Sequence, residues 1–171
     1  GHVTVTLTDL AHGHRIIDVE PGNTVARHYG VAIDIGTTTI AVQLVCLPSV
    51  EILSTVSAYN SQVECGLDII SRINYARRPD RLAELQSRVL ETINRLLAQL
   101  HDETDVALTD ITSAAISGNT TMIHLLLGLN PEPIRLEPYT PTIMAAAVYL
   151  AKDLGLDIHG EALVRLSPAI G

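Results

Sequence analysis

The first apolar positions of the chain recur with the period of a β-strand. Val3, Val5 and Leu7 alternate with threonines, and this alternation is typical of a strand with one buried face. A second short strand is predicted over residues 15–19, before the turn-forming residues 20–23. Two strands without a helix do not make a stable domain. Residues 1–28 are therefore interpreted as the tail of a preceding domain or as a lid on the following one.

Three longer apolar runs follow, at residues 31–35, 40–47 and 52–59. Short connections rich in Gly, Thr, Pro and Ser separate these runs. Since connections of a few residues join antiparallel neighbours, the pattern predicts a three-stranded antiparallel meander.

From residue 67 onward the apolar positions change to helical spacing. A helix is predicted over residues 67–76, with Asp68 and Arg72 as a supporting i, i+4 pair. A longer helix is predicted over residues 81–101 and is interpreted as structural. Its apolar stripe consists of Leu82, Leu85, Val89, Ile93, Leu96 and Leu100.

The remaining segments alternate strand and helix patterns. A strand is predicted over residues 111–117, and a helix over residues 120–127 with Asn119 as its N-cap and Gly128 as its stop. A Pro-rich loop leads to an Ala-rich helix predicted over residues 143–154, and a last strand is predicted over residues 162–166. This order predicts an α/β layer architecture with a mixed sheet.

Composition narrows the partners of the protein. Nineteen acidic residues against eleven basic ones leave a net charge of −8, and the chain contains neither Phe nor Trp. Without cationic clusters and stacking platforms, we expect no nucleic-acid partner. No window holds the eighteen uncharged apolar residues of a membrane span, and the two cysteines do not make a disulfide framework. We therefore expect no membrane partner and a cytoplasmic location.

The first candidate site is the turn after the first strand of the meander. Gly36 lets the backbone reverse close to a ligand, and the hydroxyls and N–H groups of Thr37, Thr38 and Thr39 then face one spot, as a phosphate requires. Asp34 at the strand end suits Mg²⁺ held through water. The alternative is an ordinary hairpin turn with an Asp cap. A carboxylate buried in an apolar run needs a partner, which favours the phosphate interpretation.

The second candidate site is the strand–turn–helix junction at residues 117–121. The N–H groups at such a helix start can take an anion or a water molecule, and a capped helix without any ligand is the alternative. His124 in this helix is interpreted as a satisfied helix histidine rather than a base. The chain has no GxxxxGK[ST], GxGxxG, GxSxG or HExxH motif, which excludes P-loop and dinucleotide sites.

The order of elements and these two motifs resemble the first lobe of the ASKHA ATPases, the group of actin, sugar kinases, acetate kinase and the heat-shock chaperones. More narrowly, residues 29–171 are similar to the reductive activators of corrinoid proteins. The segments that carry this similarity are Tyr29-Gly30-Val31-Ala32-Ile33-Asp34-Ile35-Gly36-Thr37-Thr38-Thr39, Ser57-Ala58-Tyr59-Asn60, Asp68-Ile69-Ile70-Ser71-Arg72-Ile73, Ser117-Gly118-Asn119-Thr120-Thr121-Met122-Ile123-His124-Leu125-Leu126 and Pro138-Tyr139-Thr140-Pro141.

The resemblance implies an α/β fold with an RNase H-like ASKHA lobe, in which a three-stranded antiparallel meander extends into a mixed sheet with flanking helices. In that family a [2Fe–2S] ferredoxin domain precedes linker and middle domains, and an ASKHA ATPase domain closes the chain. The implied parent protein binds ATP and Mg²⁺ and reduces Co(II) corrinoid to Co(I) on a partner corrinoid protein or corrinoid methyltransferase. Residues 1–28 would be the tail of the middle or linker domain, and residues 29–171 an incomplete first lobe of the ATPase.

The resemblance also implies roles for individual residues. Asp34 would be the catalytic carboxylate that holds Mg²⁺ through water. The implied nucleotide-binding residues are Gly36, Thr37, Thr38, Thr39, Gly118, Asn119 and Thr120. Sugar kinases of the hexokinase type have an Asp-Thr pair where this chain has Asn119-Thr120. Because an amide cannot act as a general base, this departure argues against a hexokinase-type phosphotransferase.

An ASKHA site lies between two lobes, and its second phosphate loop and most adenosine-binding residues belong to the later part of the fold. We expect a Gly-Gly-Asp loop to follow Gly171, and we expect these residues alone to form half an active site without activity. Two other interpretations stay open. One is an ASKHA kinase for a small molecule, and the other is a non-catalytic binding module whose exposed apolar lobe face supports a homodimer.

Overall fold

The computed structural model describes residues 1–10, 13–143 and 145–168. In chain order its elements are β1 (Val3–Leu10), β2 (Gly13–Pro21), β3 (Tyr29–Ile35), β4 (Thr39–Cys46), β5 (Glu51–Tyr59), η1 (Ser61–Cys65), α1 (Ile69–Tyr75), α2 (Pro79–Thr104), η2 (Leu108–Asp110), β6 (Ile111–Gly118), α3 (Thr120–Leu126), α4 (Glu132–Arg135), β7 (Ala147–Leu150), α5 (Ala151–Leu154) and β8 (Leu163–Leu166).

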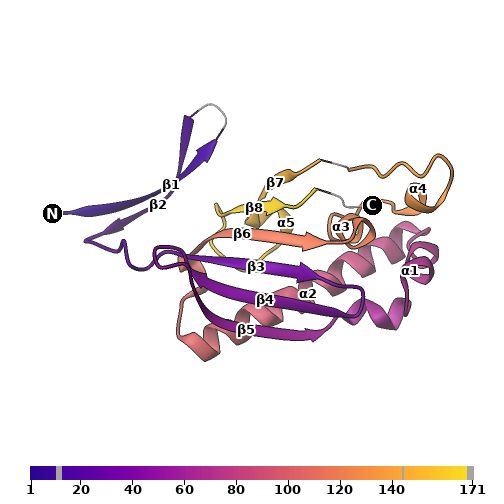
Figure 1. Ribbon diagram of the computed structural model, residues 1–171, viewed down its shortest axis with the longest axis horizontal. Coiled ribbons are helices and arrows are strands. Elements are labelled where there is room, and N and C mark those ends of the chain that lie inside the picture. Colours follow the sequence, from indigo (N-terminus) through magenta and orange to yellow (C-terminus); the bar gives the residue numbers. More distant parts are fainter. Residues whose placement is uncertain (11–12, 144, 169–171) are drawn as a thin grey trace.

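A six-stranded mixed sheet with the order β5-β4-β3-β6-β8-β7 forms the body of the protein (Figure 1). The strands β3, β4 and β5 pair antiparallel as the predicted meander. The strand β6 pairs parallel with β3, and β8 pairs parallel with β6. A parallel pair requires a long crossover, which α1 and α2 supply between β5 and β6. The predicted fold class, a meander that extends into a mixed sheet with flanking helices, is confirmed.

The helices gather behind one face of this sheet (Figure 1). The predicted long helix is α2, and its buried stripe faces the apolar side chains of the sheet's inner face. Fully buried examples are Ile93 and Leu97 from α2, and Ile35 and Val42 from the sheet. One hydrophobic core between helix and sheet therefore holds the body together.

The opposite face of the sheet carries small and polar side chains. Ala115, Asp34 and Ser117 are exposed there, and Ala32 and Gln43 are half-buried. Because side chains alternate between the two faces of a strand, the same strands that build the core also build this open face. The candidate site lies at one end of it.

The hairpin β1–β2 forms a separate two-stranded sheet that projects from the body (Figure 1). On its surface, Val5 pairs with Val19 and Leu7 pairs with Ile16, and these side chains are largely exposed. Polar contacts connect the hairpin with the last part of the chain. They are an ion pair between Arg15 and Glu161, a 3.4 Å hydrogen bond from Arg165 Nη2 to Thr8 Oγ1, and a 3.9 Å contact between His159 Nε2 and Asp18 Oδ2.

The helix predicted over residues 143–154 is wrong for most of its length. In its place the chain forms β7 and then the single turn of α5, and residue 144 lies outside the described residues. The strand β7 pairs antiparallel with β8 at the sheet edge, with Tyr149 opposite Val164. Alanine favours helices in isolation, but pairing with β8 outweighs this weak preference.

The first predicted helix begins two residues later than expected. Asp68 is its N-cap, because the Asp68 carboxylate accepts a 2.7 Å hydrogen bond from the Ser71 N–H. Leu67 therefore precedes the helix, and its side chain is 82% exposed. Among the residues that the structure describes, no helix combines the length and the hydropathy needed to cross a bilayer.

The core predicts a clear difference between two Leu→Ala substitutions. Leu96 on α2 is only 1% exposed, whereas Leu67 is 82% exposed. We expect Leu96→Ala to lower the free energy of unfolding by about 2–5 kcal/mol through lost burial and a new cavity. For Leu67→Ala we expect a change within about 0.5 kcal/mol. Urea denaturation followed by circular dichroism measures both, and equal losses would contradict the assignment of the core.

Candidate functional site

The parallel pairing of β3 with β6 brings the two predicted motifs to the same edge of the sheet. In this register Asp34 lies opposite Ser117, and Ile35 lies opposite Gly118. The turn that follows β3 and the junction that follows β6 are therefore neighbours. Ligands of open α/β sheets bind at this carboxyl edge of parallel strands.

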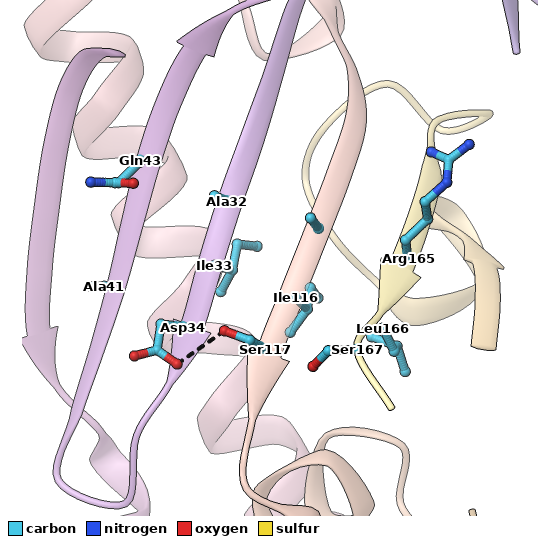
Figure 2. A pocket seen from close by; sticks show the side chains of 11 residues that line it. Ala32, Ile33, Asp34, Ala41, Gln43, Ile116, Ser117, Arg165, Leu166 and Ser167 are labelled. Atoms are coloured by element: carbon cyan, nitrogen blue, oxygen red, sulfur yellow. Dashed lines mark hydrogen bonds between the residues drawn. The ribbon is translucent and has the colours of Figure 1, made fainter. Parts of the chain in front are cut away.

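The Asp34 side chain lies on the open face of the sheet, where Ser117 Oγ donates a 3.1 Å hydrogen bond to Asp34 Oδ1 (Figure 2). The expectation of a buried carboxylate is wrong, because strand alternation turns Asp34 away from the core while Ile33 and Ile35 point into it. The charge of Asp34 needs no internal partner and remains accessible to a ligand.

The turn between β3 and β4 is narrow. The Gly36 N–H donates a 2.9 Å hydrogen bond to the Thr39 carbonyl, which closes the turn. A Cβ atom on Gly36 would lie only 2.6 Å from that same carbonyl oxygen. Glycine is therefore required at this position by space. The Thr38 and Thr39 side chains are exposed, and Thr37 is half-buried.

Donors of the two buried residues Asn60 and Arg72 hold the carbonyl groups of this turn from the inside. Asn60 Nδ2 donates to the Gly36 carbonyl at 3.0 Å, and the Asn60 N–H donates to the Thr38 carbonyl at 2.8 Å. Arg72 Nη2 donates to the Thr37 carbonyl between them at 2.5 Å. Three consecutive carbonyls of the turn therefore point toward donors in the protein interior.

Asn119 connects the two motifs through its side chain. Its Oδ1 accepts a 3.0 Å hydrogen bond from the Met122 N–H, so the predicted N-cap of α3 is confirmed. Its Nδ2 donates to Thr37 Oγ1 at 3.2 Å. A Cβ atom on Gly118 would lie 2.9 Å from the Ile35 carbonyl, so this junction also requires glycine for its close approach to β3. The predicted residue Thr120 is buried at the start of α3.

A shallow cavity of about 550 Å³ extends over the open face from Asp34 and Ser117. Figure 2 shows Asp34, Ser117 and Ser167 in a row near the ends of three neighbouring strands. The Ser167 N–H donates to the Ile116 carbonyl at 2.9 Å, which fixes Ser167 beside β6. No pattern in the sequence pointed to Ser167, since only the pairing of β8 with β6 brings it here.

Arg72 and Asn60 also support the turn, although no sequence motif pointed to either residue. Arg72 was interpreted as the partner of Asp68 in a helical ion pair, but its side chain is fully buried. Asn60 is also fully buried and caps η1 by accepting a 3.1 Å hydrogen bond from the Gln62 N–H. One feature of the sequence could have indicated that Arg72 is buried. It directly precedes the apolar Ile73, which is buried beside it on α1.

The donor set of the site fits Mg²⁺ bound together with a phosphate ligand. Across residues 1–10, 13–143 and 145–168, no group of three His, Cys, Asp or Glu side chains could hold a metal ion by itself. Asp34 offers a single accessible carboxylate. Mg²⁺ commonly keeps several waters and takes one or two carboxylates plus the oxygens of substrate phosphates.

His124 is a structural residue of α3. Its Nδ1 donates to the Thr120 carbonyl at 2.7 Å, and its Nε2 accepts a 3.0 Å hydrogen bond from the Thr142 N–H. This pair of bonds requires the neutral ring with the proton on Nδ1. Burial lowers the pKa of His124 below its ordinary value. The interpretation of His124 as a satisfied histidine rather than a base fits this geometry.

Comparison with known proteins gives a consistent set of relatives. The sequence profile of the family described as RACo middle region matches residues 29–171. The corrinoid activation enzyme RamQ of Eubacterium limosum is 34% identical over 164 residues, which are 95% of this chain and 28% of that protein. A solved structure of a reductive activator for corrinoid, iron-sulfur protein has a TM-score of 0.91 and 41% identity, and the match covers 97% of this chain and 27% of the other. The chain thus spans less than a third of the length of these relatives.

The close contacts around Gly36 and Gly118 predict that an added methyl group at either position destabilises the protein. We expect Gly36→Ala and Gly118→Ala each to lower the free energy of unfolding by about 1–3 kcal/mol, because each new Cβ meets a backbone oxygen. Gly160→Ala is the matched control, since its nearest neighbour would be the Lys152 Cβ at 3.7 Å. Thermal unfolding compares the three variants, and equal stabilities would contradict the described turn and junction.

The buried His124 predicts a loss of stability in acid. Its pKa in the folded protein lies below the ordinary value of 6.5, so the unfolded chain binds more protons as the pH falls below about 7. The free energy of unfolding should therefore decrease from pH 7 to pH 5, with His124 contributing at most about 1.4 kcal/mol per pH unit. We expect His124→Gln to reduce this slope. The exposed His2 provides the control His2→Gln, and an identical slope in all three proteins would refute the role of His124.

Proposed function

The chain belongs to the RACo middle region family, and from this membership we propose that it forms part of the ATP-binding domain of a longer protein that reductively activates corrinoid proteins. The names of the two relatives support this proposal, since one is a corrinoid activation enzyme and the other a reductive activator for corrinoid, iron-sulfur protein. In the proposed reaction, ATP binding and hydrolysis help to drive Co(II) corrinoid to Co(I) on the partner, a corrinoid protein or a corrinoid methyltransferase.

The observation that carries the proposal is the junction of the two motifs. The bond from Asn119 Nδ2 to Thr37 Oγ1 joins residues that are far apart in the sequence, and it holds the turn after β3 against the start of α3. We propose that the phosphates of ATP lie at this junction. The exposed hydroxyls of Thr38 and Thr39 would donate to phosphate oxygens, and Gly118 would let the backbone come close to them.

Asp34 is the proposed acidic residue of the site. Its accessible carboxylate would hold Mg²⁺ through water, and the hydrogen bond from Ser117 keeps the carboxylate oriented. When bound, Mg²⁺ neutralises charge on the phosphate oxygens and polarises the phosphorus that is attacked. This part of the proposal rests on the fit between one carboxylate and the preference of Mg²⁺ for mixed ligation by water, carboxylate and phosphate.

The rest of the proposed active site lies in parts of the longer protein outside this chain. We propose that residues 29–171 are the first lobe of the ATPase domain and that residues 1–28 end the preceding middle or linker domain. The separate sheet of β1 and β2 supports this division. The [2Fe–2S] group, the second phosphate loop and most adenosine contacts would come from the remaining length of the parent protein, so this chain alone would be inactive.

The environment of Asn119 favours ATP hydrolysis over phosphoryl transfer to a sugar. Both atoms of its side-chain amide are already engaged, one with the Met122 N–H and the other with Thr37 Oγ1. An amide in this position cannot remove a proton from an acceptor hydroxyl. A hexokinase-type kinase would need a carboxylate there.

The proposed role of Asp34 predicts a large loss of ATP hydrolysis in the full-length protein carrying Asp34→Asn. We expect the rate of phosphate release to fall about a hundredfold, because a lost Mg²⁺ contact removes several kcal/mol of transition-state stabilisation. Reduction of the Co(II) corrinoid partner, followed by absorbance, should fall in parallel. The control is Asp153→Asn, which removes an exposed acid on α5. Unchanged hydrolysis and reduction in Asp34→Asn would refute the site assignment.

A further inference from the structure

Arg72 on α1 places a buried guanidinium directly behind the turn between β3 and β4. The side chain is fully buried. Its Nη2 donates to the Thr37 carbonyl at 2.5 Å, and its Nε donates to the Gly66 carbonyl at 2.8 Å. Its Nη1 contacts Gln62 Oε1 at 3.3 Å and Met122 Sδ at 3.4 Å. All four partners are uncharged.

In the part of the chain that the structure describes, no carboxylate lies within 4.0 Å of the Arg72 guanidinium nitrogens, and Asp68 attracts this charge only from farther away. None of the ion pairs found there includes Arg72. The acid one turn earlier, Asp68, is exposed and uses its carboxylate to cap α1 at the Ser71 N–H. Burial lowers the pKa of Arg72, but a guanidinium stays protonated in proteins. A buried charge is costly unless an opposite charge pairs with it directly, and Arg72 has no such direct anionic partner among the described residues.

The geometry of the turn indicates where that partner binds. In a planar trans peptide the C=O and the following N–H point in opposite directions. The carbonyls of Gly36, Thr37 and Thr38 point inward to Asn60 and Arg72. The N–H groups of Thr37, Thr38 and Thr39 therefore point outward, away from these donors. Consecutive outward N–H groups form a concave site for an anion.

We propose that Arg72 is a positioning residue for the phosphate site, which holds the turn with its N–H groups outward and whose buried charge is balanced by the bound phosphate. This inference rests on the proposed function of the turn in nucleotide binding. Arg72 acts through the Thr37 carbonyl and does not touch the ligand. The planar fork of an arginine is needed, because a lysine ammonium is a point charge that cannot reach Thr37 and Gly66 with the same geometry.

The test measures nucleotide affinity in the full-length protein by calorimetric titration with a non-hydrolysable ATP analogue and Mg²⁺. Arg72→Met removes the charge and the fork at similar length, and we expect its dissociation constant to rise at least tenfold. Arg72→Lys keeps the charge and loses the fork, and we expect a rise of at least threefold that stays below that of Arg72→Met. Arg95→Met removes an exposed charge from α2 as the matched control and should bind like the wild type.

A second measurement separates positioning from mere stability. In steady-state hydrolysis, we expect the KM for ATP to rise with the dissociation constant while kcat changes less than threefold, as for uniform loss of binding. Titrations are made well below the unfolding temperature of each variant, so a folded variant reports on the site alone. If Arg72→Met does not fold, Arg72→Lys decides the question by itself.

The outcomes distinguish this inference from the proposed function. If the wild-type protein does not bind the analogue, the proposed function is wrong and the inference falls with it. If the wild type binds and either folded Arg72 variant binds equally tightly, the inference alone is overturned. Weaker binding in both Arg95→Met and the Arg72 variants would also overturn it. The loss of any positive charge would then be enough to weaken nucleotide binding, wherever that charge lies.

Discussion

The parallel pairing of β3 with β6 is the constraint on which the rest of the structure depends. It requires a long crossover, and α1 and α2 make this crossover across one face of the sheet. The core forms where they pack, and the opposite face stays open. The same pairing sets Asp34 beside Ser117 and Ile35 beside Gly118. One strand register therefore determines the core, the open face and the meeting of the two motifs.

The local pattern of apolar residues was sufficient to predict the strands and helices in which that pattern repeats regularly. Alternation and short connections predicted the meander, and the apolar stripe predicted α2. The exposure of Asp34 was not predictable, since it depends on which face the helices cover. Pairing with β8 decided that an Ala-rich segment became β7 rather than a helix. The position of Ser167 and the burial of Arg72 depend on the docking of distant elements, which a single sequence does not encode in any local period.

The candidate site combines an accessible surface with a rigid interior support. Its exposed groups are Asp34, Thr38 and Thr39. Behind them Asn60, Arg72 and Asn119 use their hydrogen bonds on the backbone and side chains of the turn. Buried polar groups destabilise a protein when some of their hydrogen bonds are missing. When all of these bonds are formed, the groups make the structure rigid and specify one conformation. The support fixes the shape of the turn before any ligand is bound.

The open face of the sheet also has an entropic consequence. Ala32, Ala41 and Ala115 occupy neighbouring strands on this face, and an alanine side chain has no rotamers to lose. Whatever segment or molecule covers the face immobilises few side chains of the sheet, with Gln43 and Arg165 as the main exceptions. Covering or uncovering this face therefore changes the conformational entropy of the sheet itself very little.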